Sequence, residues 1–420
     1  MNLARPLLAN RLYLLLLAGV LVSHLAAYLV TPLFPVFLEK VGGFGLGQVG
    51  LILGVGSFAF QIGSLLGGFL SDQLGRRTVM VAGVLLQGVA MIGYGLSQAF
   101  VAFLGFAIVN GSGLGMYAPA VKAMIVSSVG SANRTTAFSW RGIAANLGII
   151  IAGLSITLLA LGTDRRIFFY SAAVLLALAL FTRLALPDDR TAEQPSQRTA
   201  WTECKKILSH RSFLLFSAVS LLIWALYAQF ALILPLRGEY VLGSPAQIGL
   251  IWTINSLVLV LLQGPVSRLV LERINPYYSL FIGTMLIGLG ISSLGLANGF
   301  LALSLAAVVF IVGEMMLMPI WDSLVGHFAT AELLGAYYGL ANVVMAVGSA
   351  MGTAVGGSLV ERLGGVGSRL PWLGYALATL FFLCLVGLFV YYAKDRHGGG
   401  QHQPTSGTGG IAHIFKEKVK

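Results

Sequence analysis

Charged side chains are scarce in this chain. Only 10% of its 420 residues are Asp, Glu, Lys or Arg, whereas 57% are hydrophobic and the mean hydropathy is +0.88. A soluble domain carries about 25% charged residues, because its surface must face water. So little charge excludes a soluble globular protein and predicts a chain that lies in a lipid bilayer.

Cysteines are also few, and the common catalytic motifs are missing. The two cysteines, Cys204 and Cys384, lie far apart, which excludes a disulfide framework and a cysteine-based metal site. The sequence contains no G-x-x-x-x-G-K-[ST] phosphate loop, so ATP-driven work by this chain is not expected. We therefore predict no enzyme activity, no cofactor and no bound metal.

The net charge of +11 does not indicate nucleic-acid binding, because no basic soluble domain accompanies it. Lys and Arg collect instead in loops that flank apolar runs, as they do on the cytoplasmic side of membrane proteins. The first apolar run, 12–38, is longer than the roughly 7–15 residues of a signal peptide and lacks an A-x-A cleavage site. It is expected to remain as a first transmembrane helix.

Long apolar runs recur along the whole chain. A hydrocarbon core of about 30 Å needs about 20 apolar residues per helix. The predicted fold class is thus an all-α membrane protein with 12 transmembrane helices. The expected spans are 12–38, 46–71, 78–97, 100–126, 137–161, 167–186, 212–236, 246–271, 277–296, 300–327, 334–360 and 371–393.

A polar segment between the sixth and seventh spans divides the chain into two parts. We expect an N-terminal six-helix half at 1–186, a cytoplasmic linker at 187–211 and a C-terminal half at 212–394. Within the linker, 200–209 (AWTECKKILS) could form a short interfacial helix. The Gly-rich polar tail at 395–420 is expected to be disordered and cytoplasmic.

The two halves resemble each other at a nearly constant offset. Pro35 pairs with Pro235, and Gly68 pairs with Gly264. A parallel repeat of this kind predicts two pseudo-symmetric halves in the same membrane orientation. Further matches include Gln48, Gly50 and Ile52 with Gln247, Gly249 and Ile251, and Gly113, Met116 and Pro119 with Gly313, Met316 and Pro319.

The distribution of Lys and Arg predicts the orientation. If both termini are cytoplasmic, the inner loops hold more cations than the outer loops, as the positive-inside rule requires. The inner set is Arg5, Arg11, Arg76, Arg77, Arg134, the linker cations, Arg268, Arg273 and the tail; the outer set is Lys40, Arg165, Arg166, Arg237, Arg362 and Arg369.

A short charged segment between the second and third spans carries the most specific motif. It reads G-x-x-x-D-x-x-G-R-R, with Gly68, Asp72, Gly75, Arg76 and Arg77. This spacing resembles the signature of the cytoplasmic loop between helices 2 and 3 of the major facilitator superfamily, whose members are twelve-helix secondary transporters. The position of the motif, one helical hairpin into the chain, supports the resemblance.

The resemblance implies that the first, fourth, seventh and tenth helices line a central substrate cavity. The residues expected there are mainly apolar and aromatic, and methionine suits surfaces that adapt to varied ligands. Packing within the bundle or exposure to lipid is the alternative role for many of them. The candidates are Tyr28, Asn110, Met116, Tyr117, Trp224, Tyr227, Gln229, Phe230, Trp252, Asn255, Met315, Met316 and Trp321.

Glu314 is the main candidate for proton coupling. It lies midway along the tenth span, in VGEMMLMPIWD, and resembles the Gly-Glu element of some proton-driven efflux proteins. A charged side chain at this depth costs about 2.5–3.5 kcal/mol and usually faces a cavity or a partner. We expect Glu314 to bind and release a proton as the cavity opens to each side. The alternative is a structural glutamate that is held by a neighbouring helix.

Two further sites in the spans are candidates for coupling. Asp322 and Lys122 are repeat mates at an offset of 200 and are expected to form a salt bridge between the halves that closes the cytoplasmic side. Both could instead reach the headgroups with their charged ends. His24 has a pKa suited to proton relay, although hydrogen bonding within the bundle is the favoured interpretation.

Arg134 and Arg141 complete the predicted conformational set. They lie on the side where Asp72 emerges and are expected to join a charge network around Arg76 and Arg77. Two family features are missing. Ala107 stands where many drug–proton antiporters have an arginine, and the fifth span lacks their Gly-Pro pair. These departures bear on proton antiport and not on the fold.

The combined prediction is a bacterial inner-membrane transporter that exports amphipathic or lipophilic compounds in exchange for protons. Its partners would be a small-molecule substrate, protons and the lipid bilayer, with no nucleic acid, and it would act as a monomer. One alternative is a major facilitator for another cargo, such as a lysolipid, siderophore or metabolite, with or without proton coupling. Another is a receptor that uses the same scaffold and transports nothing.

Overall fold

The computed structural model describes the chain except for residues 1–6, 8, 131–132, 188–208, 330–332 and 399–420. The described residues form helices joined by turns and short loops, and they include no strand. Twelve of their helical segments are long and apolar enough to cross a membrane. The predicted fold class is therefore confirmed. Most of the expected interfacial helix at 200–209 and of the tail lies outside the described residues.

The N-terminal half contains six spans. Its first span is formed by α2 (Arg11–Val30) and the short α3 (Phe34–Lys40), and Asn10 caps α2 by accepting a hydrogen bond from the backbone N–H of Tyr13 at 3.1 Å. The remaining five spans are α4 (Leu46–Leu74), α5 (Arg76–Leu96), α6 (Phe100–Ser128), α7 (Arg134–Leu158) and α8 (Arg166–Ala185).

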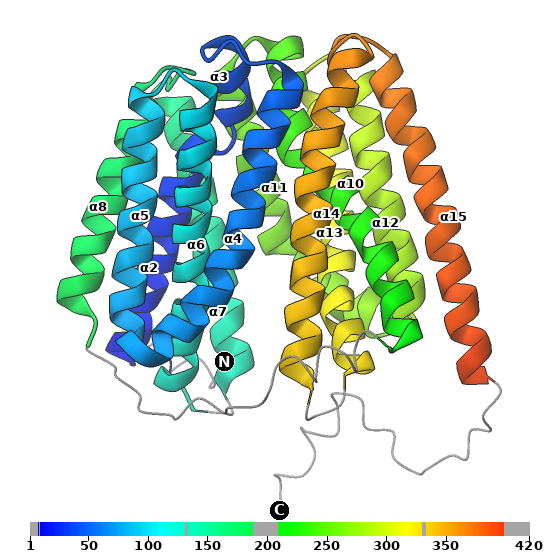
Figure 1. Ribbon diagram of the computed structural model, residues 1–420, viewed down its shortest axis with the longest axis horizontal. Helices are drawn as coiled ribbons and strands as arrows, with labels where there is room; N and C mark the ends of the chain where they lie inside the picture. Colours follow the sequence, from blue (N-terminus) through cyan, green and yellow to red (C-terminus); the bar gives the residue numbers. More distant parts are fainter. Residues whose placement is uncertain (1–6, 8, 131–132, 188–208, 330–332, 399–420) are drawn as a thin grey trace, which may run out of the picture.

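The C-terminal half also contains six spans, and the two halves lie side by side (Figure 1). We call the end where α2 begins the lower end and the opposite end the upper end. The helices are α10 (Arg211–Leu242), α11 (Pro245–Val266) with its π-helical extension η2 (Ser267–Leu271), α12 (Pro276–Ser293) with a 3₁₀ turn η3 (Leu294–Leu296), α13 (Phe300–Phe328), α14 (Leu334–Arg362) and α15 (Leu370–Gly398).

Equivalent glycines make equivalent contacts in the two halves. A Cβ atom at Gly83 of α5 would meet the carbonyl oxygen of Gly113 on α6 at 2.6 Å. A Cβ atom at Gly283 of α12 would meet that of Gly313 on α13 at 3.1 Å. Both pairs are related by the offset of 200, so the sequence repeat is also a repeat of helix packing. The same relation links the contact of Gly148 with Leu21 to that of Gly348 with Leu221.

The two halves meet along two helix pairs near the upper end. Gly50 in the first third of α4 contacts Thr353 in the last third of α14. Gly153 near the end of α7 contacts Gly249 near the start of α11. These two interfaces are themselves pseudo-symmetric, because α4 and α11 are equivalent helices, as are α7 and α14. Small residues here let the helix backbones approach closely.

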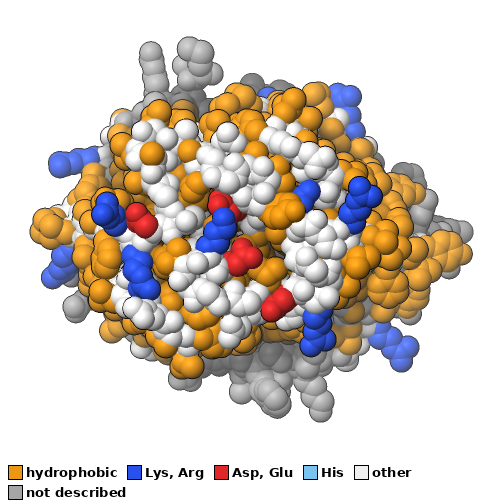
Figure 2. Space-filling view, turned by 90° about the horizontal axis from the view of Figure 1, so that it is seen from above, with side chains coloured by type: hydrophobic (Ala, Val, Ile, Leu, Met, Phe, Trp, Pro, Cys, Tyr) orange, Lys and Arg blue, Asp and Glu red, His pale blue; other side chains and the backbone are white. Residues whose placement is uncertain are grey.

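Polar interactions strengthen the same upper end. Lys40 at the end of α3 forms an ion pair with Glu239 of α10 at 2.6 Å. The backbone N–H of Gly47, in the first turn of α4, donates to Glu361 of α14 at 2.8 Å. We call these four residues the upper gate. Figure 2 shows acidic and basic side chains gathered near the middle of this face.

The halves separate toward the lower end. The lower parts of α4 and α14 diverge (Figure 1). Lys122 of α6 and Asp322 of α13, which both lie toward the lower end, are exposed. The structure is thus joined above and open below.

The charged motif forms a tight turn at the lower end. α4 ends at Leu74 and α5 begins at Arg76, so Gly75 is the single residue between them. Its φ of +86° is a conformation that favours glycine. Arg76 donates to the hydroxyl group of Ser127 at 2.8 Å, and Arg77 donates to the carbonyl oxygen of Leu186 at 3.2 Å. The two arginines therefore tie the turn to the lower ends of α6 and α8.

Candidate functional site

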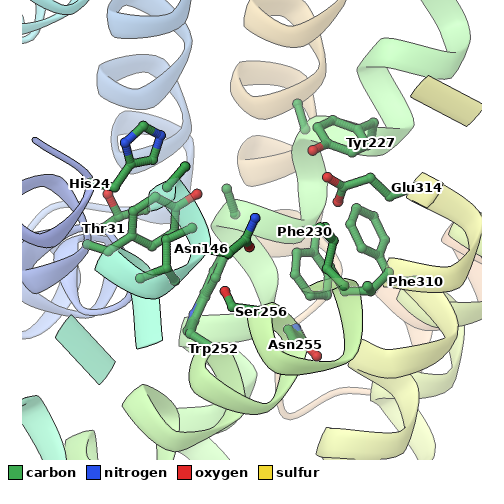
Figure 3. Close-up of a pocket in the computed structure, with 17 residues that line it drawn as sticks. His24, Thr31, Asn146, Tyr227, Phe230, Trp252, Asn255, Ser256, Phe310 and Glu314 are labelled. Carbon is green, nitrogen blue, oxygen red and sulfur yellow. The ribbon is translucent and has the colours of Figure 1, made fainter. Parts of the chain in front are cut away.

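A cavity of about 300 Å³ lies between the two halves. Its lining comes from α2 and α7 of the N-terminal half and from α10, α11 and α13 of the C-terminal half (Figure 3). This volume is at the lower limit of small-molecule pockets, which are about 300–1,000 Å³. The cavity lies directly below the glycine contacts that join α7 to α11, so its upper side is closed.

An aromatic series forms one wall of the cavity. Tyr28 of α2 meets Trp252 of α11 edge to face, with ring centroids 5.6 Å apart. Trp252 contacts Phe230 of α10 at 5.6 Å, and Phe230 stacks on Phe310 of α13 at 3.8 Å. Tyr227 contacts Phe310 at 5.4 Å. Such a wall offers a large, rigid apolar surface to a flat or branched ligand.

Several polar groups interrupt the apolar lining. Both amide atoms of Asn255 are buried, and neither has a hydrogen-bond partner in the described part of the chain. The indole N–H of Trp252 is also buried and has no hydrogen-bond partner among the described residues. Asn146 donates one hydrogen bond, to the carbonyl oxygen of Gly142 at 3.0 Å. A buried polar group without a partner is costly, so a ligand that pairs with Asn255 would gain free energy.

Glu314 faces the cavity from the middle of α13 (Figure 3). Its carboxylate points toward the hydroxyl group of Tyr227, close enough for a side-chain hydrogen bond. Tyr28 of the other half is a second electrostatic neighbour. Within the described ranges, no Lys, Arg or His lies at ion-pair distance from Glu314. The cavity therefore contains a carboxyl group that no fixed cation holds in the charged form.

His24 lies on the opposite side of the cavity, on α2 (Figure 3). Its Nδ1 atom is 2.8 Å from the carbonyl oxygen of Val20. A carbonyl can only accept, so Nδ1 carries the proton and Nε2 remains available. The predicted hydrogen bond within the bundle is present, and the second nitrogen could still relay a proton.

The repeat mates Lys122 and Asp322 do not form an ion pair in the described structure, although each lies in the electrostatic field of the other. Arg141 of α7 is half-buried, one helical turn below the cavity residue Ala145. Its electrostatic neighbours are Tyr117, Lys122 and His24.

The remaining members of the conformational set lie near the lower end. Arg134 is the first residue of α7 and is exposed. Gly68 is not packed closely against another element, because a Cβ atom there would have no neighbour within 4 Å. The side chain of Asp72 lies outside the described part of the structure. The predicted charge network between Asp72 and Arg134 or Arg141 therefore stays a prediction.

The cavity uses helices that the family resemblance did not suggest. Five expected residues line it, namely Tyr28, Tyr227, Phe230, Trp252 and Asn255. The fourth span, α6, contributes none of the lining, because its glycine-rich faces pack against α4 and α5. The expected residues Asn110, Met116, Tyr117, Trp224, Gln229, Met315, Met316 and Trp321 do not line this cavity.

Specific contacts account for several of these positions. Gln229 points away from the cavity and accepts a hydrogen bond from the hydroxyl group of Tyr375 on α15 at 2.9 Å. Trp321 donates to Ser220 at 3.0 Å. Met116 packs where its backbone meets Gly67 of α4. Each of these side chains holds helices together.

Sequence reasoning missed the contribution of α7. Asn146, Ala145 and Ile149 line the cavity from this helix, and Ser256 and Phe310 line it from α11 and α13. Asn146 is a polar side chain within an apolar span, which was a usable signal. Ala145 and Ile149 gave no signal, because alanine and isoleucine also occur on lipid-facing surfaces.

Two six-helix halves with a cavity between them are the architecture of membrane transporters built from parallel repeats. The sequence matches the family model of the Major Facilitator Superfamily over residues 16–353 and again over 239–419. The chain belongs to this family, as its loop motif indicated. It is accordingly a multi-pass membrane transporter and not an enzyme.

Relatives and solved structures agree with this assignment. The multidrug resistance protein MdtH of Klebsiella pneumoniae is 25% identical over 397 residues, which are 93% of this chain and 96% of MdtH. MdtH of Salmonella typhimurium is 25% identical over 387 residues, or 91% of this chain and 94% of that protein. The nucleoside transporter NupG shares the fold with a TM-score of 0.78 at 15% identity, covering 94% of this chain and 100% of NupG. The POT family transporter PepTSo shares the fold with a TM-score of 0.73 at 14% identity, covering 93% of this chain and 99% of PepTSo.

Proposed function

We propose that this transporter exports small amphipathic or lipophilic compounds in exchange for protons. The observation that carries the proposal is Glu314, a lone carboxyl group in a largely aromatic cavity between the two halves. The aromatic series suits apolar ring systems, and Asn255 offers unpaired polar atoms to orient them. The similarity to proteins named MdtH, described as multidrug resistance proteins, supports this class of cargo.

The proton step follows from the isolation of Glu314. Removing a carboxylate from water favours its neutral, protonated form, unless a cation stays beside it. When the cavity is open, water can hydrate the charged form and the proton can leave. When the cavity closes, the charged form loses that hydration, so closure without cargo favours a bound proton. The hydroxyl group of Tyr227 can donate to the carboxylate and reduce the cost of the charged state.

The family architecture gives the proposed membrane arrangement. We place the lower end in the cytoplasm of a bacterial inner membrane, with both termini inside, because Arg76, Arg77 and Arg134 lie there. In this orientation the structure is open to the cytoplasm and closed above. We further propose that one chain suffices, because both faces of the cavity come from the same chain.

Closure of the lower end would bring Lys122 and Asp322 together. They lie on equivalent helices and are electrostatic neighbours already. As the lower ends of α6 and α13 approach, their separation can fall to ion-pair distance. The turn at Gly75 and its two arginines would hold α4, α6 and α8 together during this movement.

The test is proton movement in proteoliposomes that contain the purified protein and an internal pH indicator. A panel of lipophilic cations, neutral compounds and anions is added to the wild type and to Glu314→Gln. We expect at least one compound to drive proton movement that Glu314→Gln abolishes. The matched control is Glu272→Gln, because Glu272 is an exposed glutamate of the same half and lies outside the cavity.

Two outcomes would point to the alternatives. If labelled compounds cross the membrane without proton movement, the protein is a facilitator for that cargo and Glu314 is structural. If nothing crosses but compounds bind, the scaffold acts as a receptor. Proton movement that is equal in the wild type and in Glu314→Gln would place the carrier elsewhere.

A further inference from the structure

The inner surface of the N-terminal half carries positive charge below the cavity. Lys122 of α6 and Arg141 of α7 are electrostatic neighbours of each other, and His24 of α2 is a further electrostatic neighbour of Arg141. Asp322 of the other half acts electrostatically on Lys122, and the two are not at ion-pair distance in the described structure. Among the described residues, Lys122 and Arg141 thus act on each other as like charges, and neither forms an ion pair.

Arg141 is the most informative member of this group. It is half-buried, and its Nε atom is fully buried. No side chain or backbone carbonyl within the described residues accepts a hydrogen bond from its guanidinium group. A buried guanidinium N–H without a partner is costly, and structures normally supply it with a carboxylate or a carbonyl oxygen. The described residues thus provide no acceptor for the Nε–H of Arg141.

A second donor lies beside the same position. The hydroxyl group of Tyr117 is buried and has no hydrogen-bond partner among the described residues, and Arg141 is its electrostatic neighbour. Tyr117 and Lys122 of α6 are thus both electrostatic neighbours of Arg141 on α7. All three are donors at neutral pH, and donors of this kind together fit an anionic group.

The location connects this group to the cavity. Arg141 lies four residues before Ala145, which is about one helical turn, or about 6 Å, along α7. His24 belongs to the cavity lining and is also an electrostatic neighbour of Arg141. A ligand with its apolar part against Trp252 and Phe230 could therefore extend a short polar arm downward to Arg141.

We propose that Arg141, with Lys122 and Tyr117, binds an anionic group of the transported compound, such as a carboxylate, sulfonate or phosphate. Guanidinium groups bind such planar or tetrahedral anions through two hydrogen bonds at once. The apolar remainder of the compound occupies the aromatic cavity. This inference rests on the proposed export of amphipathic compounds and narrows its cargo to amphipathic anions.

The competing explanation is an internal partner. If the lower end closes, Asp322 could approach Arg141 as well as Lys122, and the arginine would then serve the conformational change alone. Such a role would affect all cargo equally, whatever the charge of its head group. A set of probes that differ only in that charge separates the two explanations.

The experiment uses three fluorescent probes with one apolar body. Dansylglycine carries a carboxylate, its methyl ester is neutral, and dansylethylenediamine carries an ammonium group. Binding to the purified full chain in lipid nanodiscs is followed by dansyl emission. The variants are Arg141→Gln, Arg141→Lys and Lys122→Gln. The control is Arg183→Gln, because Arg183 is an exposed arginine at the lower end of α8, away from the cavity.

Of the three probes, dansylglycine should bind the wild type most tightly. We expect its affinity to fall about ten-fold or more in Arg141→Gln, because a charge-assisted hydrogen bond is lost. The affinities of the ester and of the amine should change by less than about three-fold in the same variant. Arg141→Lys should fall between the wild type and Arg141→Gln, because the charge remains but the paired geometry is lost. Arg183→Gln should match the wild type with all three probes.

Three results would overturn the inference: equal binding of dansylglycine and its ester by the wild type, an equal loss for all probes in Arg141→Gln, or no binding of any probe. Proton movement in proteoliposomes keeps the proposed function separate. If the amine or ester drives protons while dansylglycine neither binds nor moves, the inference fails and the antiport stands. If dansylglycine binds through Arg141 but no probe moves protons, the anion site stands and the antiport fails.

Discussion

Gly50 of α4 offers a direct way to disturb the closed upper end. A Cβ atom at this position would overlap the carbonyl oxygen of Thr353 on α14, and it would lie 3.3 Å from the Cα atom of Ala354. Both neighbours are backbone atoms, which cannot rotate away as a side chain can. Gly50→Ala should therefore push α4 and α14 apart and favour a state that is open above.

The expected size follows from the cost of overpacking. Forcing one methyl group into a close contact costs about 1–3 kcal/mol. If the cost falls only on the state in which α4 and α14 touch, the ratio of the open to the closed upper end rises by about 5–150-fold. Gly105→Ala is the matched control, because a Cβ atom there meets nothing within 4 Å and Gly105 also lies inside a helix.

The assay measures access to the cavity from above. Ser256 lines the cavity, and Ser256→Cys can be introduced after Cys204 and Cys384 are replaced by serine. A membrane-impermeant maleimide on the upper side should label this cysteine faster in Gly50→Ala, by about the factor given by the population shift. An unchanged rate in a folded Gly50→Ala protein would refute the view that this contact closes the upper end.

Three further predictions concern the gates and the turn. Lys40→Met should speed the same upper-side labelling by about 1.4- to five-fold, because a partly exposed ion pair contributes roughly 0.2–1 kcal/mol. Exchanging Lys40 and Glu239 should restore the slow rate, and a swapped protein that is labelled as fast as Lys40→Met would argue against the pair. Neutralising Lys122 or Asp322 alone should reduce uptake of a labelled substrate into inside-out vesicles. If exchanging the two residues restores no uptake, the proposed ion pair between them at the lower end is wrong. Gly75→Ala should lower the free energy of unfolding by about 1–3 kcal/mol, because alanine is strained at a φ of +86°. Thermal unfolding measures this loss, and an unchanged stability would contradict the assigned role of Gly75.

The helices and their repeat were accessible from the sequence. Apolar length alone located the twelve spans, because a bilayer fixes how long such a helix must be. The repeat related Gly113 to Gly313, and the structure adds that these glycines make matching contacts with Gly83 and Gly283. The turn at Gly75 was expected from the loop motif and has the glycine conformation that such a short connection needs.

The direction in which each side chain points was not accessible. A transmembrane helix is apolar on every face, so its sequence does not show which face meets the cavity. Gln229 and Trp252 both belonged to the expected cavity set, yet only Trp252 lines the cavity, because Gln229 turns toward Tyr375. The isolation of Arg141 was equally hidden, since a sequence does not show which cation lacks a partner.

The central claim is that Glu314 carries the proton, and the most direct measurement compares uphill transport with exchange. Proteoliposomes with a transported compound on both sides are assayed for one-for-one exchange without a proton gradient, and then for accumulation driven by a gradient. We predict that Glu314→Gln keeps exchange, because a permanently neutral side chain still lets the loaded cavity rock, and loses gradient-driven accumulation. Accumulation at the wild-type level in Glu314→Gln would contradict the account.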